Sequence, residues 1–85
     1  MRGNGLEKLV NKIIGQNIKS IRLDHGMSQS DVAKILDMSF QQVQKYENGL
    51  NRISASNLFL LAQSLRIPVE DFFTGIAVHF EGEKK

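Results

Sequence analysis

Apolar residues recur along most of the chain at spacings of three and four, the period of an α-helix, and few segments alternate as strands do. The first apolar stripe predicts a helix over residues 11–25. This stripe consists of Ile14, Ile18 and Ile21. Gly15 leaves open whether the helix continues as one rod through the apolar residues before it. Gly26 is expected to end the helix, because glycine readily takes a positive φ.

Three serines stand just before the next apolar stripes, and each predicts the start of a helix. The helices begin after Ser28, Ser39 and Ser54 and are expected to end near residues 36, 47 and 65. Asp31 favours the positive end of the first of them, and Gln42 completes a capping box with Ser39. Asn48 and Gly49 form a stop signal after the second. The residues expected to face the core are Val32, Ala33, Leu36, Val43, Tyr46, Leu58, Leu61, Ala62 and Leu65.

Pro68 suits the first turn of a short fifth helix that ends at Gly75. This helix carries Val69, Phe72 and Phe73. Ile76, Val78 and Phe80 alternate with Ala77, His79 and Glu81, a period of two that favours a short strand or an extended arm. The pattern therefore predicts an all-α fold, a compact bundle of five short helices. It divides the chain into a flexible segment at 1–10, a domain at 11–75 and a C-terminal arm at 76–85.

Composition narrows the classes of function. The chain has 85 residues and 41% hydrophobic residues, as expected of one small globular domain. It has no cysteine, which excludes disulfides and thiolate zinc sites and fits a cytoplasmic setting. His25 and His79 have no ligand cluster near them, so we expect no metal site and no cofactor. We also expect no membrane span, no signal peptide and no catalytic constellation.

The charge distribution adds a mild indication of an anionic partner, since the formal net charge is +2. Five Lys and Arg residues against two acids lie within residues 1–25. Any basic surface must therefore be assembled from the first helix and a few scattered residues.

The second and third predicted helices are joined by a break of about three residues, the spacing of a helix-turn-helix. Such a motif places its second helix in the major groove of DNA. Ala33 is small enough to let the two helices cross, and Val43 is expected to pack into that crossing. Asp37 lies in the turn, where a residue that tolerates a left-handed backbone is needed.

At these positions the chain resembles the Cro/cI-type helix-turn-helix proteins, or XRE family. The resemblance rests on Ser28-Gln29-x-x-Val32-Ala33 and on Val43-x-x-Tyr46-Glu47-Asn48-Gly49, and it covers roughly residues 14–73. The chain departs from the family at Asp37, where the family usually has glycine. The resemblance implies a lambda repressor-like domain that binds double-stranded DNA and regulates transcription, expected here to be a repressor that binds an inverted-repeat operator as a homodimer.

The resemblance also implies roles for individual residues. Base edges would be contacted by Phe40, Gln41, Gln44 and Lys45. The DNA backbone would be contacted by Gln29, Ser39, Asn48, Asn51 and Arg52. Arg22 and Glu47 match a structural ion pair that joins the first helix to the third. No small-molecule ligand and no membrane partner is expected.

Several alternatives remain open at this point. Phe40 is as well suited to a core position as to an outward one, and Gln41, Gln44 and Lys45 also fit an ordinary solvated face. Phe73 and residues 76–80 form either a dimer contact or an apolar layer on their own domain. An antitoxin-like module that binds a partner protein, with DNA binding secondary, is the alternative function.

Overall fold

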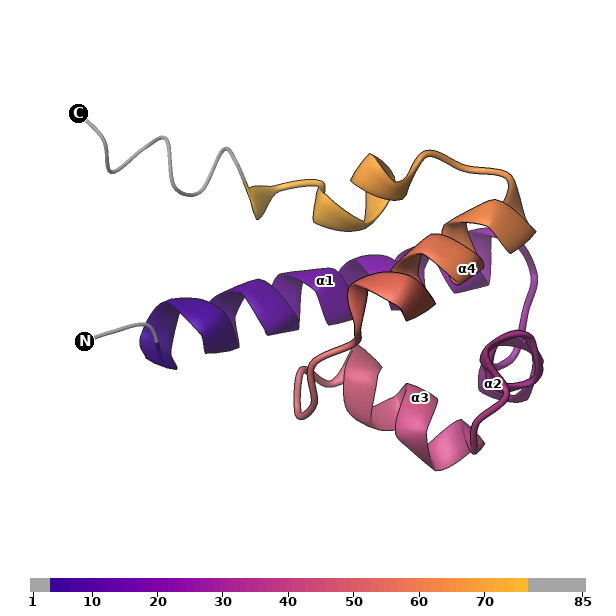
Figure 1. The fold of residues 1–85 in the computed structure, drawn as a ribbon, viewed down its shortest axis with the longest axis horizontal. Coiled ribbons are helices and arrows are strands. Elements are labelled where there is room, and N and C mark those ends of the chain that lie inside the picture. The colour runs from indigo at the N-terminus through magenta and orange to yellow at the C-terminus, as the bar shows by residue number, and fades with distance from the viewer. Residues whose placement is uncertain (1–3, 77–85) are drawn as a thin grey trace.

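The computed structural model describes residues 4–76 and shows four α-helices followed by one 3-10 helix, with no strand among those residues (Figure 1). The elements are α1, Asn4–Asp24; α2, Gln29–Leu36; α3, Phe40–Glu47; α4, Ala55–Leu65; and η1, Val69–Phe73. The predicted all-α class is confirmed. The predicted arm lies outside the described residues from position 77 onward. No helix within residues 4–76 is long and apolar enough to cross a membrane.

Helix α1 is one continuous rod of 21 residues. The predicted start near residue 11 is wrong, because α1 begins seven residues earlier, at Asn4. Val10 explains the difference, since it packs against the core one turn before Ile14 and so extends the apolar stripe. Gly15 does not interrupt the helix. After α1 the chain turns at Gly26, whose φ of 67° confirms the left-handed conformation expected there.

Serine side chains cap three of the helices, as the sequence predicts. The Ser28 hydroxyl accepts from the backbone N–H of Asp31 at 3.0 Å, and the Asp31 carboxylate accepts from the Ser28 N–H at 2.8 Å, a complete capping box. Ser39 accepts from the Gln42 N–H at 3.2 Å. The return bond from the Gln42 side chain is not formed between these two residues, so this predicted box is only half present. Ser54 caps α4 in the same way, at 3.0 Å.

The core lies where α1 packs against α3 and η1, and where α2 packs against α3 and α4 (Figure 1). Its buried residues are Ile14, Ile18, Val32, Ala33, Leu36, Val43, Tyr46, Leu58, Leu61, Ala62 and Phe72. The predicted core positions are confirmed except Leu65, which is only partly buried. Because α2 and α3 both contribute side chains to this core, the helix pair is fixed on the rest of the domain.

The predicted short fifth helix is present as a 3-10 helix, but Pro68 precedes it instead of occupying its first turn. A side chain of α1 holds this segment in place. The Asn17 amide donates to the carbonyl oxygens of Phe72 at 2.8 Å and Thr74 at 2.9 Å. These bonds satisfy carbonyls that have no partner at the end of so short a helix. Phe72 is fully buried, whereas the neighbouring Phe73 side chain is exposed.

Candidate nucleic-acid interface

Helix α3 buries one face and exposes the other. Val43, Tyr46 and Glu47 are buried against the rest of the domain. The four residues predicted to contact bases share the opposite, exposed face: Phe40, Gln41, Gln44 and Lys45. Phe40 is 45% exposed, so the interpretation of this residue as part of the core is wrong. The structure therefore brings an aromatic ring, two amides and an ammonium group together on one surface.

The turn between α2 and α3 fixes the angle at which this face is presented. Asp37 takes the left-handed conformation that the sequence predicted, with φ 56° and ψ 55°. Its backbone N–H ends α2 by donating toward the carbonyls of Ala33 and Lys34. Ala33 and Val43 are both buried in the predicted helix crossing. An aspartate thus performs the turn for which the family usually has glycine.

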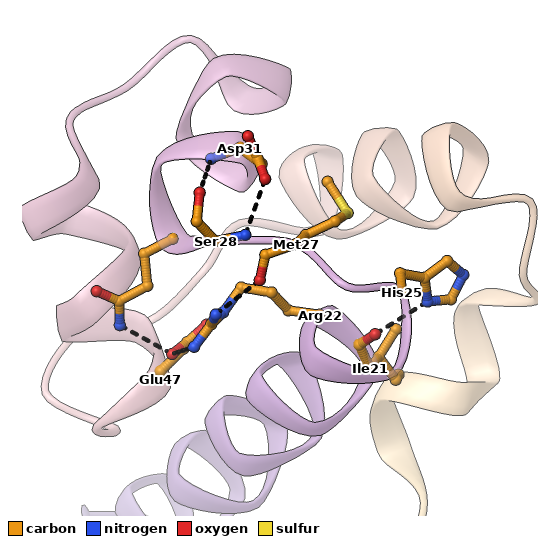
Figure 2. Close-up of polar contacts among 8 residues, drawn as sticks. Ile21, Arg22, His25, Met27, Ser28, Asp31 and Glu47 are labelled. Carbon is orange, nitrogen blue, oxygen red and sulfur yellow. Dashed lines mark hydrogen bonds and ion pairs between the residues drawn. The ribbon is translucent and has the colours of Figure 1, made fainter.

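A buried ion pair joins α1 to the carboxyl end of α3 (Figure 2). The Arg22 guanidinium donates from Nε to Glu47 Oε2 at 2.7 Å and from Nη2 to Oε1 at 3.0 Å. Its Nη1 donates to the carbonyl oxygen of Met27 at 2.9 Å, just before α2 begins. Arg22 therefore connects three segments, and its planar group allows little rotation of α3 about its axis.

Gln29 lies at the same junction. The family resemblance implies that Gln29 contacts the DNA backbone. In the structure its amide Nε2 donates to Glu47 Oε1 at 3.0 Å. The side chain is partly buried and is held in one direction by this bond. The Gln29 amide nitrogen carries a second hydrogen, which remains available to an acceptor outside the protein.

The loop after α3 carries three of the other predicted backbone contacts, Asn48, Asn51 and Arg52, and all three are exposed. Ser39 is also exposed, at the other end of α3, with its hydroxyl used in the cap. Arg52 is not free, since its Nη1 donates to Glu7 Oε2 at 2.7 Å. Both side chains are open to solvent, at 74% and 46% exposure. Sequence analysis missed Glu7, because nothing local links it to a residue 45 positions away.

Gly15 lets α1 approach α3 closely and Gly49 lets it approach the loop after α3, and sequence analysis missed both contacts. A Cβ at Gly15 would lie 2.9 Å from the carbonyl oxygen of Glu47 and closer still to that of Tyr46. A Cβ at Gly49 would lie 3.0 Å from the Cα of Lys12, and its φ is 75°. For Gly15, its position in the middle of an amphipathic helix was the available signal of a close contact, but that position does not identify the segment that comes close.

At the start of α2, the Asp31 carboxylate is stabilised by groups of the neighbouring Ser28. The backbone N–H of Ser28, followed by its hydroxyl, holds the pKa of Asp31 below its ordinary value by bonding to the charged carboxylate. Asp31 therefore carries a negative charge at the positive end of α2. Within residues 4–76, no three His, Cys, Asp or Glu side chains gather in a way that would hold a metal ion.

Comparison with known proteins agrees with this geometry. A family model described as helix-turn-helix matches residues 18–72, so residues 4–17 of α1 precede the matched region. An HTH-type transcriptional regulator of Rickettsia prowazekii is 40% identical over 75 residues, which cover 88% of this chain and 58% of that protein. Antitoxin PezA of Streptococcus pneumoniae is 32% identical over 59 residues, covering 69% of this chain and 37% of PezA.

A solved structure is also similar. The restriction-modification controller protein C.AhdI from Aeromonas hydrophila superposes with a TM-score of 0.69 at 27% identity, and the match covers 74% of this chain and 96% of that one. In contrast, this chain spans only 58% of the length of the Rickettsia prowazekii relative. The shared region thus corresponds to almost the whole of the controller protein and to little more than half of the longer regulator.

Proposed function

Because this chain belongs to the helix-turn-helix family of transcription regulators, of the Cro/cI or XRE type, we propose that it binds a specific sequence of double-stranded DNA through α3. The observation that carries the proposal is the division of α3 into a buried face and an exposed polar one. The Arg22–Glu47 pair supports it by fixing the direction in which the exposed face points. We propose a binding function in the cytoplasm and no catalytic one.

In this proposal the exposed face of α3 contacts base edges in the major groove. The amides of Gln41 and Gln44 match the donor and acceptor pair of adenine, and the Lys45 ammonium matches the two acceptors of guanine. The exposed ring of Phe40 suits a thymine methyl group. These are the groups through which the protein would distinguish one sequence from another.

Residues at both ends of α3 would bind the DNA backbone. Gln29 keeps one amide hydrogen for a phosphate while Glu47 holds the other, so its orientation is set before DNA arrives. Ser39 lies at the start of α3, and Asn48, Asn51 and Arg52 follow its end. Contacts of this kind set the register of the protein and make affinity depend on salt, but they carry no sequence information.

We also propose that the protein binds an inverted repeat as a homodimer and represses transcription by occupying promoter DNA. Large exposed apolar side chains outside α3 support a dimer. They include Phe59, Leu60 and Phe73. For a two-fold symmetric dimer we expect half-sites about one helical turn apart, about 34–36 Å between centres.

Selection of binding sites from a random pool of duplex DNA, at two salt concentrations, tests the proposal directly. We expect a palindromic motif to be enriched and binding to weaken steeply at the higher salt concentration. A Lys45→Ala variant should keep the motif but accept any base at one position of each half-site, at a cost of about 1–3 kcal/mol for the preferred base. If no motif is enriched at either salt concentration, the proposed function is wrong.

The similarity to antitoxin PezA favours one second candidate, a protein-binding antitoxin in which DNA binding is secondary. Coexpression with the product of the adjacent gene, followed by size-exclusion chromatography, distinguishes the two. A stoichiometric complex that abolishes the toxicity of the adjacent gene's product would favour the antitoxin function. Motif enrichment by the isolated protein, with no such complex, would favour the regulator.

A further inference from the structure

The first turns of α1 lie against the loop that follows α3. Glu7 reaches this loop through its 2.7 Å ion pair with Arg52. The backbone of Lys12 is in contact with the loop at Gly49, where even a Cβ atom would crowd it. Figure 1 shows the loop beneath the amino-terminal half of α1. Residues 7–12 of α1 and residues 49–52 therefore form one continuous surface, which we call the α1–loop surface.

This surface has an excess of positive charge. Lys8 and Lys12 are four residues apart on α1, so they lie on the same side of the helix one turn from each other. Both side chains are exposed, and within residues 4–76 neither has a carboxylate at ion-pair distance. Together with Arg52 and Glu7, the surface carries three cations and one anion. A surface of this kind attracts an anionic polymer that runs past it.

We propose that the α1–loop surface is a further DNA-backbone contact, in which Lys8 and Lys12 bind phosphates beyond those reached by the loop itself. The inference rests on the proposed DNA-binding function and extends its footprint along the strand. Lys8 and Lys12 precede the family-matched region, so this contact would be added to the helix-turn-helix by the amino-terminal half of α1. Arg52 exchanges Glu7 for a phosphate on binding, which its open, solvent-screened ion pair permits.

The test is the salt dependence of binding to a labelled duplex of about 30 base pairs with random sequence. Phosphate contacts are independent of sequence, so the operator need not be known. Each of Lys8→Gln and Lys12→Gln should reduce the slope of log affinity against log salt by about one, and the double variant by about two. At about 0.1 M salt each substitution should weaken binding by about fivefold to tenfold.

The matched control is Arg66→Gln, which removes the same charge at the opposite end of α4 from the loop, about 16 Å along the helix. This variant should keep the wild-type slope. Far-UV circular dichroism verifies that each variant is folded. If the lysine variants also keep the wild-type slope, or if Arg66→Gln lowers it equally, the inference is wrong while DNA binding stands. If the wild-type protein binds no duplex even at low salt, the proposed function itself is wrong.

Discussion

Gly15 occupies the point where α1 crosses the carboxyl end of α3, and the backbone carbonyl oxygens of Tyr46 and Glu47 leave no room there for a Cβ atom. Those two carbonyls belong to the last turn of α3, where they have no partner within the helix. Glycine permits this approach because it has no side chain. The usual cost of a glycine within a helix is therefore offset by close packing between α1 and the helix proposed to enter the DNA groove.

Gly15→Ala should destabilise the protein, although alanine is the better helix former. Propensity alone would add about 1 kcal/mol of stability, but the new methyl group would force α1 away from α3 at a cost of about 1–3 kcal/mol. Urea unfolding followed by circular dichroism measures the net change. Gly5→Ala is the matched control, since it lies in the same helix with nothing within 4 Å of the added atom. Equal stabilisation of both variants would contradict the packing role.

Glu47 is the second residue on which the position of α3 depends. Its carboxylate is almost fully buried and accepts bonds from Arg22 and from Gln29. Glu47→Ala should cost about 3–5 kcal/mol of unfolding free energy, because it leaves the Arg22 charge buried without a partner. The double variant Arg22→Met with Glu47→Leu should be more stable than Glu47→Ala alone. Thermal unfolding of the three proteins checks this order, and a double variant less stable than the single one would refute it.

At the scale of elements, the starts of α2 and α3 are each fixed by a serine cap with its own local bonds. Ser28 and Asp31 satisfy each other's backbone N–H groups before α2, and Ser39 does half of this before α3. Such bonds connect residues only three apart. Because these bonds form independently of the core, the positions at which the two helices start follow from the local sequence alone.

The capping box should make the stability of the fold depend on pH. The folded-state pKa of Asp31 lies below its ordinary value of 3.8, so the charged form stabilises folding at neutral pH. This stabilisation is complete above the ordinary value and is lost as the pH falls through the lower, folded-state pKa. Asp31→Asn should therefore be less stable than wild type at about pH 7, and the difference should shrink in strong acid. Urea unfolding at both pH values measures it, and a difference that grows in acid would contradict the assignment.

The difference between local bonds and contacts that are distant in the sequence explains which features could be predicted from the sequence. The cap serines, the left-handed Asp37 and the buried stripe of α3 all depend on neighbours within one or two turns, and each was predicted correctly. The Asn17 bonds to η1 and the Glu7–Arg52 pair join residues 45 or more positions apart. No periodicity marks such contacts, because any polar residue on an exposed face would produce the same pattern.

At the scale of the whole molecule, α1 is the element that links two sides of the domain. Its core-facing side chains contact both α3 and η1, which lie on opposite sides of it (Figure 1). Asn17 holds η1 through two carbonyl oxygens, while Arg22 holds α3 through Glu47. A second protomer that docks on the η1 side would therefore leave the exposed face of α3 accessible to DNA.

The side chain of Phe73, on η1, provides the test of that arrangement. It is 40% exposed beside the fully buried Phe72, so a charge there disturbs an interface more than the core. Phe73→Asp should convert a dimer into a monomer of 9.6 kDa, measured by analytical ultracentrifugation. Binding to an inverted repeat should then weaken by at least about a hundredfold, because the two half-sites are no longer linked. Leu50→Asp is the control for assembly, since this residue is 71% exposed in the loop on the α3 side and should leave the dimer intact. A wild-type monomer, or a Phe73→Asp variant that remains dimeric, would show that η1 does not form the interface.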